Sequence, residues 1–155
     1  MRAIVLSAGQ GKRLLPLTAD VPKCLLAVDG ERTVLDVQLA TLARCGVTHV
    51  SVVSGFGLEK VEAFLARNPV RGLAVELVYN PFYGVSDNLA TCWVVREAMG
   101  GDFVLLNGDT LFEPAVLRRL LGSRQAAITV TIDHKDRYDG DDMKVLGDRG
   151  GVRLA

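Results

Sequence analysis

Short apolar runs alternate with amphipathic segments along most of the chain. The runs that are typical of strands lie at residues 3–6, 49–53, 73–79, 103–107 and 127–132. Helices are predicted between them, at residues 34–45, 58–68, 87–99 and 114–121. This alternation of strand and helix predicts a doubly wound α/β fold with helices on both faces of the sheet. The run at 103–107 is nearly continuously apolar, which predicts burial on both of its faces.

Capping residues stand where two of these helices should begin. Thr33 can cap the first helix, and Ser86 or Asp87 can cap the third. In an open α/β sheet, ligands bind beyond the carboxyl ends of the strands. We therefore expect the loops that follow the strands to form one site.

A glycine-rich loop directly follows the first predicted strand. It comprises Leu6, Ser7, Ala8, Gly9, Gln10, Gly11, Lys12 and Arg13, with Pro16, Thr18, Pro22 and Lys23 downstream. Glycine lets main-chain N–H groups approach an anion closely, and successive N–H groups form an anion-binding concavity. The guanidinium of Arg13 adds a planar donor fork for phosphate oxygens, and Lys23 adds a point charge. The loop predicts a triphosphate site; the alternative is a glycine-rich turn followed by exposed basic residues.

Two better-known phosphate loops do not fit. A P-loop requires serine or threonine after Gly11-Lys12, but Arg13 follows, and Leu6 stands where its first glycine belongs. The dinucleotide fingerprint requires a third glycine at the position of Leu14.

Asp109 is the candidate metal ligand. It follows Gly108 at the end of a predicted buried strand, where glycine allows close approach. One carboxylate together with phosphate oxygens suits Mg²⁺. The alternative is an aspartate that begins a turn.

Polar residues in two later segments are further candidates. Asn80, Asp87 and Asn88 can hydrogen-bond a base or a sugar, although Asp87 can equally serve as a helix cap. Lys144 lies on an apparent strand at 143–146, where its side chain faces either the site or the solvent.

Composition limits the kinds of partner. The chain has 155 residues, and its 18 Lys and Arg balance 18 Asp and Glu. This balance argues against general binding to nucleic acid or to an anionic membrane, so phosphate binding must come from a local site. Three cysteines without a Cys-x-x-Cys pair fit a reducing compartment. No membrane span or signal peptide is apparent, so we expect a cytoplasmic protein.

The glycine-rich loop, with Arg13, Pro16, Thr18, Pro22 and Lys23, resembles the signature of the sugar-phosphate nucleotidyltransferase superfamily. The stretches 22–26, 86–93, 107–112 and 141–145 look most like its phosphocholine and inositol-1-phosphate cytidylyltransferase branch. The resemblance implies a three-layer, Rossmann-like mixed sheet in a single domain spanning residues 1–155.

The resemblance also implies a reaction and a set of roles. An NTP, expected to be CTP, would be joined to a phosphorylated alcohol or sugar with release of pyrophosphate and with Mg²⁺ as cofactor. Arg13, Lys23 and Asp109 would be catalytic, with Asp109 on the metal. The loop residues 6–12 with Asn80, Asp87 and Asn88 would bind the nucleotide, and Lys144 would bind the acceptor. The resemblance does not decide the oligomeric state, and a homo-oligomer is one of the options.

Alternatives remain at this stage. A thymidylyl- or guanylyltransferase would share the same loop, because base choice depends on loop contacts. A glycosyltransferase with an Asp-containing metal motif does not account for the Gly9–Arg13 loop. A non-catalytic regulatory domain would usually lose Arg13, Lys23 or Asp109. The superfamily continues with a glycine-lysine stretch and a late metal aspartate that do not follow Leu154, so we expect a chain truncated at its C-terminus.

Overall fold

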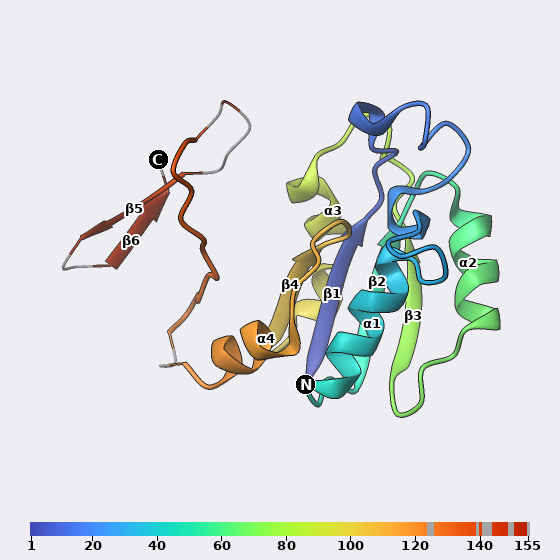
Figure 1. The fold of residues 1–155 in the computed structure, drawn as a ribbon. Helices are drawn as coiled ribbons and strands as arrows, with labels where there is room; N and C mark the ends of the chain where they lie inside the picture. Colours follow the sequence, from blue (N-terminus) through green and yellow to red (C-terminus); the bar gives the residue numbers. More distant parts are fainter. Residues whose placement is uncertain (124–125, 139, 141–143, 149–150, 155) are drawn as a thin grey trace. The chain divides into compact units, whose positions relative to one another are not determined.

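Four parallel strands form the centre of the fold in the computed structural model of the chain (Figure 1). They are β1 (Arg2–Ser7), β2 (His49–Ser54), β3 (Ala74–Tyr79) and β4 (Phe103–Asn107), in the order β3-β2-β1-β4. All three pairings are parallel, so the carboxyl ends of the strands meet at one edge. The predicted doubly wound α/β class is confirmed.

The structure describes residues 1–123, 126–138, 140, 144–148 and 151–154. The chain divides into two compact units, Met1–Ser123 and Arg124–Ala155, and the first contains the whole parallel sheet. The second contains β5 (Val145–Asp148) and β6 (Gly151–Leu154), which pair antiparallel. The two late strands were predicted at 143–146 and 152–154; residue 143 lies outside the described residues.

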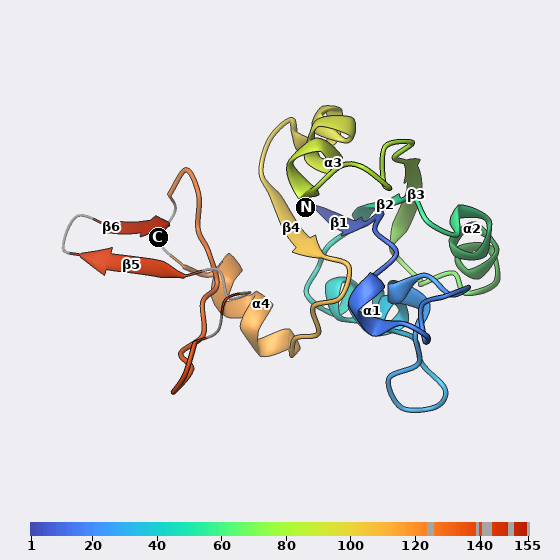
Figure 2. The same ribbon diagram turned by 90° about the horizontal axis from the view of Figure 1, so that it is seen from above.

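Helices cover both faces of the sheet (Figure 2). One face contacts α1 (Val34–Arg44), α2 (Leu58–Arg67) and α4 (Pro114–Leu121). The other contacts α3 (Asn88–Val94) and the 3-10 turn η3 (Arg96–Met99). Two shorter 3-10 turns, η1 (Lys12–Leu14) and η2 (Lys23–Leu25), belong to the loop after β1.

The alternation of side chains along β1 divides the core into two layers. Ala3 and Val5 pack with the leucines of α1, whereas Ile4 and Leu6 pack with Val95 on the opposite face. Ala3, Ile4 and Val5 are fully buried, as expected for a central parallel strand.

α1 begins at a complete capping box. The Thr33 hydroxyl accepts a hydrogen bond from the Asp36 amide at 3.1 Å, and the Asp36 carboxylate accepts one from the Thr33 amide at 3.0 Å. These bonds satisfy two N–H groups at the start of the helix that would otherwise lack a partner. The predicted cap at Thr33 is confirmed.

The third helix is shorter than the predicted range of 87–99. α3 ends at Val94, and the chain continues as η3. The guanidinium of Arg96 donates to the Trp93 carbonyl oxygen at 2.9 Å, which satisfies an acceptor at the helix end.

Two strand predictions were wrong. β4 is not buried on both faces, since Phe103 and Leu105 are 37% and 46% exposed. β4 pairs with β1, and no described strand pairs with its other side, so it is an edge strand of the described sheet. Residues 127–132 form no strand, because no described strand pairs with them, and their apolar side chains at 128, 130 and 132 are exposed.

We expect Thr33→Ala to lower the free energy of unfolding by about 1 kcal/mol, because the capping oxygen is lost. Urea unfolding measures this change. Thr33→Ser retains the oxygen and should unfold at nearly the wild-type midpoint. Equal midpoints for the alanine variant and the wild type would show that the cap contributes nothing.

Candidate functional site

The loop after β1 is closed by its own hydrogen bonds. Gly11 adopts the left-handed conformation, with φ of 73°. Its carbonyl oxygen accepts hydrogen bonds from the buried Thr18 hydroxyl and from the Leu14 amide, both at 2.9 Å. A side chain at position 11 would also meet the stem of Lys23, 3.1 Å from an ideal Cβ position. The left-handed conformation thus favours the second glycine of the motif, and a side chain there would also crowd the Lys23 stem.

Lys23 connects this loop to the end of β4. Its stem crosses Gly11, and its ammonium group forms an ion pair with the Asp109 carboxylate. Both side chains stay partly exposed, at 32% and 41%. The structure therefore brings together two of the three residues predicted to be catalytic, although 86 positions separate them in the sequence.

Gly108 lets the end of β4 lie directly against the end of β1. Its amide donates to the Leu6 carbonyl oxygen at 2.7 Å. A Cβ at position 108 would lie 1.9 Å from the Ser7 hydroxyl oxygen and 2.8 Å from the Leu6 carbonyl oxygen. This contact places Asp109 beside the glycine-rich loop.

Gln38 of α1 supports the Asp109 turn from the core side, and the sequence reasoning missed it. Its side-chain nitrogen Nε2 donates to the carbonyl oxygens of Asn107 and Thr110, at 2.9 and 2.8 Å. Gln38 is 1% exposed. The sequence pattern that could have indicated this role is the position of Gln38, an amide side chain on the apolar face of the predicted helix between Leu35 and Leu42.

The three polar candidates after β3 play different parts. Asn88 donates to the side-chain oxygen of Asn107 at 3.2 Å, so it lies beside the end of β4. Asp87 caps α3 by accepting from the amides of Leu89 and Ala90. Its predicted contact with the nucleotide stays a prediction.

Asn80 is fully buried and engaged at both ends of its amide. It donates to the Thr91 and Ser86 hydroxyls at 3.0 and 3.3 Å, and it accepts from the Phe82 amide at 2.9 Å. This geometry makes Asn80 a support of the loop before α3, and direct contact with a nucleotide would require that loop to rearrange.

The remaining candidates are distributed as follows. Gly9, Lys12 and Arg13 are exposed on the loop, Gln10 is half-buried, and Leu6 and Ala8 are buried with their backbone at the end of β1. Lys144 is exposed and belongs to the second unit, directly before β5, and its acceptor role stays a prediction.

Cys24, next to Lys23, behaves as a buried apolar residue. Burial raises the pKa of its thiol, and a hydrogen bond with the Ser7 side chain opposes this effect. With 1% exposure, the group stays a protonated thiol at neutral pH rather than a reactive thiolate.

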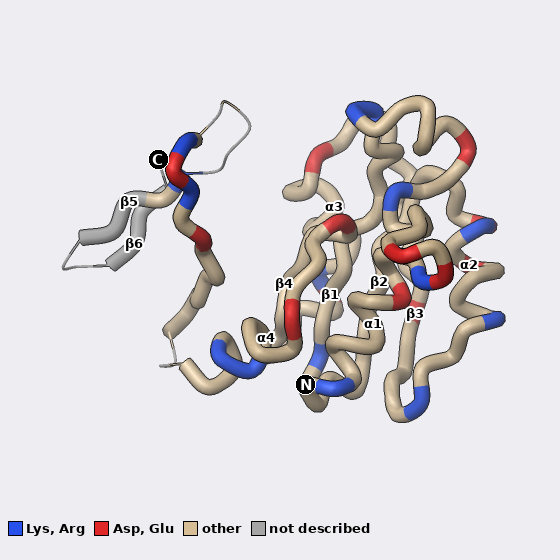
Figure 3. Tube along the Cα trace, viewed as in Figure 1, with Lys and Arg blue, Asp and Glu red and all other residues tan. Residues whose placement is uncertain are grey.

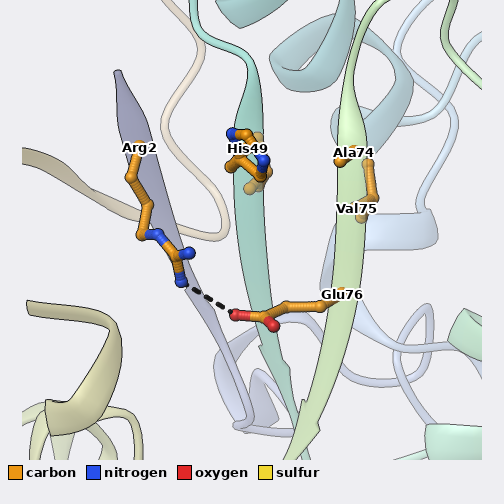
Figure 4. Close-up of a pocket in the computed structure, with 6 residues that line it drawn as sticks. Arg2, His49, Ala74, Val75 and Glu76 are labelled. Carbon is orange, nitrogen blue, oxygen red and sulfur yellow. Dashed lines mark hydrogen bonds and ion pairs between the residues drawn. The ribbon is translucent and has the colours of Figure 1, made fainter.

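A separate hollow of about 110 Å³ lies at the opposite ends of the strands (Figure 4). Arg2, His49 and Ala74 begin β1, β2 and β3 there, and Arg2 forms an ion pair with Glu76 at 3.3 Å. None of the candidate site residues lines this hollow.

The described residues form neither a metal-ligand cluster nor a membrane-spanning helix. Lys, Arg, Asp and Glu are dispersed along the trace of the first unit (Figure 3). Among the described residues, no group of three or more His, Cys, Asp or Glu side chains could hold a metal ion. No helix in that part of the chain is long and apolar enough to cross a membrane.

A single accessible carboxylate beside a glycine is nevertheless a suitable partner for Mg²⁺. This ion usually keeps several waters and takes one or two carboxylates plus substrate phosphate oxygens, rather than a cage made wholly of protein. Asp109 meets that requirement, because it stands next to the loop that would carry the phosphates.

Comparison with known proteins points to one kind of chemistry. Residues 3–140 match the MobA-like NTP transferase domain. The chain is 39% identical over 127 residues to a CMP-5'-(3-aminopropyl)phosphonate synthase of Streptomyces rubellomurinus, covering 82% of this chain and 20% of that protein. It is 28% identical to the choline-phosphate cytidylyltransferase of Streptococcus pneumoniae, covering 73% and 47%.

A solved structure agrees with these relatives. The inositol-1-phosphate CTP transferase of T. maritima superimposes with a TM-score of 0.65 at 27% identity, over 81% of this chain and 49% of that one. The chain thus spans about half or less of the length of each of these proteins. The resemblance inferred from the sequence motifs is confirmed.

We expect Gly108→Ala to lower the free energy of unfolding by about 1–3 kcal/mol, because the added methyl group has no space against Ser7 and Leu6. Gly9→Ala is the matched control, since nothing lies within 4 Å of a Cβ at that position. Urea unfolding of both variants makes the comparison. Equal losses would mean that the close approach at Gly108 is not a packing constraint.

The Cys24 thiol predicts a pH dependence of stability. Its pKa is raised in the folded state above the unfolded value of about 8.5, so its contribution is complete below that pH and is lost as the pH rises through the folded pKa. Between about pH 7.5 and 9.5 the free energy of unfolding of the wild type should fall by more than that of Cys24→Ala. Burial also raises the pKa of the Cys92 thiol. Because Cys92 is present in both proteins, its effect on stability cancels in the comparison. Parallel losses in urea unfolding would contradict the assignment.

Proposed function

This chain belongs to the MobA-like NTP transferase family, and on that premise we propose that it is the nucleotide-binding part of a Mg²⁺-dependent cytidylyltransferase. The reaction would join CTP to a small phosphorylated alcohol or sugar, or to a phosphonate, and release pyrophosphate. The observation that carries the proposal is the convergence of the glycine-rich loop, Lys23 and Asp109 at the carboxyl ends of β1 and β4.

The bond changes require no protein nucleophile. An oxygen of the acceptor's phosphate or phosphonate, already anionic, attacks the α-phosphorus of CTP. The new P–O bond forms as the bond to the bridging oxygen of the β-phosphate breaks, and pyrophosphate carries away the electron pair. Positioning and charge neutralisation are then the whole of the protein's task.

The residues of this chain divide that task. Backbone N–H groups of residues 8–11 and the Arg13 guanidinium would bind the triphosphate. Lys23 would neutralise charge near the α-phosphate, and its stem already crosses Gly11. Asn88, beside Asn107, would lie near the nucleoside.

Asp109 would hold Mg²⁺ through its carboxylate, with water and phosphate oxygens as the other ligands. Bound there, the ion would supply Lewis-acid stabilisation of the charge on the phosphate oxygens. Lys23 pairs with the Asp109 carboxylate in this structure, and beside a carboxylate that holds the ion its ammonium would be placed to neutralise the phosphates.

The names of the relatives favour cytidylyl transfer over the alternatives. The curated relatives include a CMP-5'-(3-aminopropyl)phosphonate synthase and a choline-phosphate cytidylyltransferase, and these names support including both phosphonates and phosphate monoesters among the proposed acceptors. A thymidylyl or guanylyl transfer would retain the same loop and the same carboxylate. A regulatory domain is disfavoured, because Arg13, Lys23 and Asp109 are all present. The cytoplasmic location and the homo-oligomer stay predictions.

The test is a turnover assay of the full-length protein with CTP, UTP, dTTP, GTP and ATP and with four acceptors: phosphocholine, inositol 1-phosphate, 2-aminoethylphosphonate and glucose 1-phosphate. We expect pyrophosphate release with CTP and with one of the first three acceptors. Asp109→Asn, which keeps the size and removes the charge, should lower kcat/KM by about 100-fold.

Asp102→Asn is the control, because Asp102 is exposed at the other end of β4. Preference for another NTP would overturn the cytidylyl assignment. Full activity of Asp109→Asn would remove Asp109 from the mechanism. If the protein neither bound nor turned over any of the five NTPs, its assignment as an enzyme would be overturned.

A further inference from the structure

We propose that Gln38 is a positioning residue for the metal site: by holding both carbonyl groups of the Asp109 turn, it sets the affinity of that turn for the divalent cation. This inference depends on the proposed function, because it concerns the same site. Gln38 itself touches neither the substrate nor the metal in this proposal. It acts through the backbone that carries Asp109.

The geometry of the turn is the first step. The carbonyl oxygens of Asn107 and Thr110 bracket Gly108 and Asp109, and the single Nε2 atom of Gln38 donates to both, at 2.9 and 2.8 Å. Within the turn, the Thr110 amide donates weakly to Asn107 at 3.3 Å. The two bonds from Gln38 are therefore shorter than the bond that the turn makes for itself.

The chemistry of the side chain is the second step. An amide nitrogen carries two hydrogens, and here each has a carbonyl acceptor. The Oε1 atom of Gln38 is buried and has no hydrogen-bond partner among the described residues. Reversing the amide would place an oxygen against two carbonyl oxygens, so the site accepts one orientation. Buried side-chain oxygens normally have a hydrogen-bond partner. Because the Oε1 atom of Gln38 has none among the described residues while Nε2 donates twice, we infer that the contacts with the turn determine the orientation of this amide.

The rigidity behind Gln38 is the third step. It lies on α1, whose first turn is fixed by the Thr33–Asp36 capping box and whose Leu35, Leu39 and Leu42 are buried in the core. On the other side, Gly108 is fixed to Leu6. The Asp109 carboxylate thus projects from a turn that is held at both ends, and preorganisation of this kind raises affinity for a ligand.

The experiment measures Mn²⁺ binding by electron paramagnetic resonance, with and without CTP, in the full chain. Gln38→Met keeps the length and an unbranched stem but removes both donors. We expect about a 10-fold weaker Mn²⁺ affinity in the presence of CTP. In turnover, the Mg²⁺ concentration for half-maximal activity should rise by a similar factor, while kcat at saturating Mg²⁺ stays within about threefold of wild type.

Two further variants separate positioning from general stability. Thr41→Val changes another buried polar residue of α1, one turn further along, and should leave the Mn²⁺ affinity unchanged. Gln38→Leu, a second apolar variant that lacks both donors, should weaken Mn²⁺ binding as Gln38→Met does. It also provides the test if the methionine variant does not fold.

Each result has a distinct meaning. Wild-type Mn²⁺ affinity in a folded Gln38 variant would overturn the inference while leaving the proposed function intact. A fall in kcat at every Mg²⁺ concentration, with unchanged metal dependence, would assign Gln38 to fold stability alone. Failure of the wild type to bind Mn²⁺ with CTP would instead overturn the proposed function.

Discussion

The candidate site depends on the contact between the carboxyl ends of β4 and β1. At Gly108 the two backbones approach so closely that a Cβ would lie 1.9 Å from the Ser7 hydroxyl oxygen, and the Gly108 amide bonds directly to Leu6. This contact brings Asp109 to the glycine-rich loop. Gln38 supports the same turn from the core, and Lys23 crosses Gly11 to pair with Asp109 at the surface.

Buried and exposed polar groups have different roles around that contact. Gln38, Thr18 and Asn80 are buried, and each hydrogen-bonds a backbone group that shapes a loop. Arg13 and Lys12 are exposed on the loop itself. A site for a highly charged ligand benefits from this division, because fixed dipoles need no reorganisation and accessible cations can meet the ligand.

Charge balance fits the proposed chemistry. The sequence has no net charge, and the Lys23–Asp109 pair is neutral in this structure. A triphosphate and a divalent cation would arrive with opposite charges, so the ammonium and the carboxylate would each exchange one partner for another. Such an exchange avoids leaving an unpaired charge at the edge of the sheet.

The sequence by itself determined the α/β class, the positions of β1 to β4, the helices apart from the end of α3, the cap at Thr33 and the family motifs, because periodicity, capping and glycine spacing are local properties. It did not determine that β4 exposes one face, that residues 127–132 form no strand, or that Asn80 is buried. Those outcomes depend on which strands pair and which helices cover them. The alternation of strands and helices predicted that the loops after the strands meet at one edge. The tertiary structure alone decided which side chains touch there, with Gln38 behind Asp109 and Lys23 in front of it, because these contacts join residues 69 and 86 positions apart.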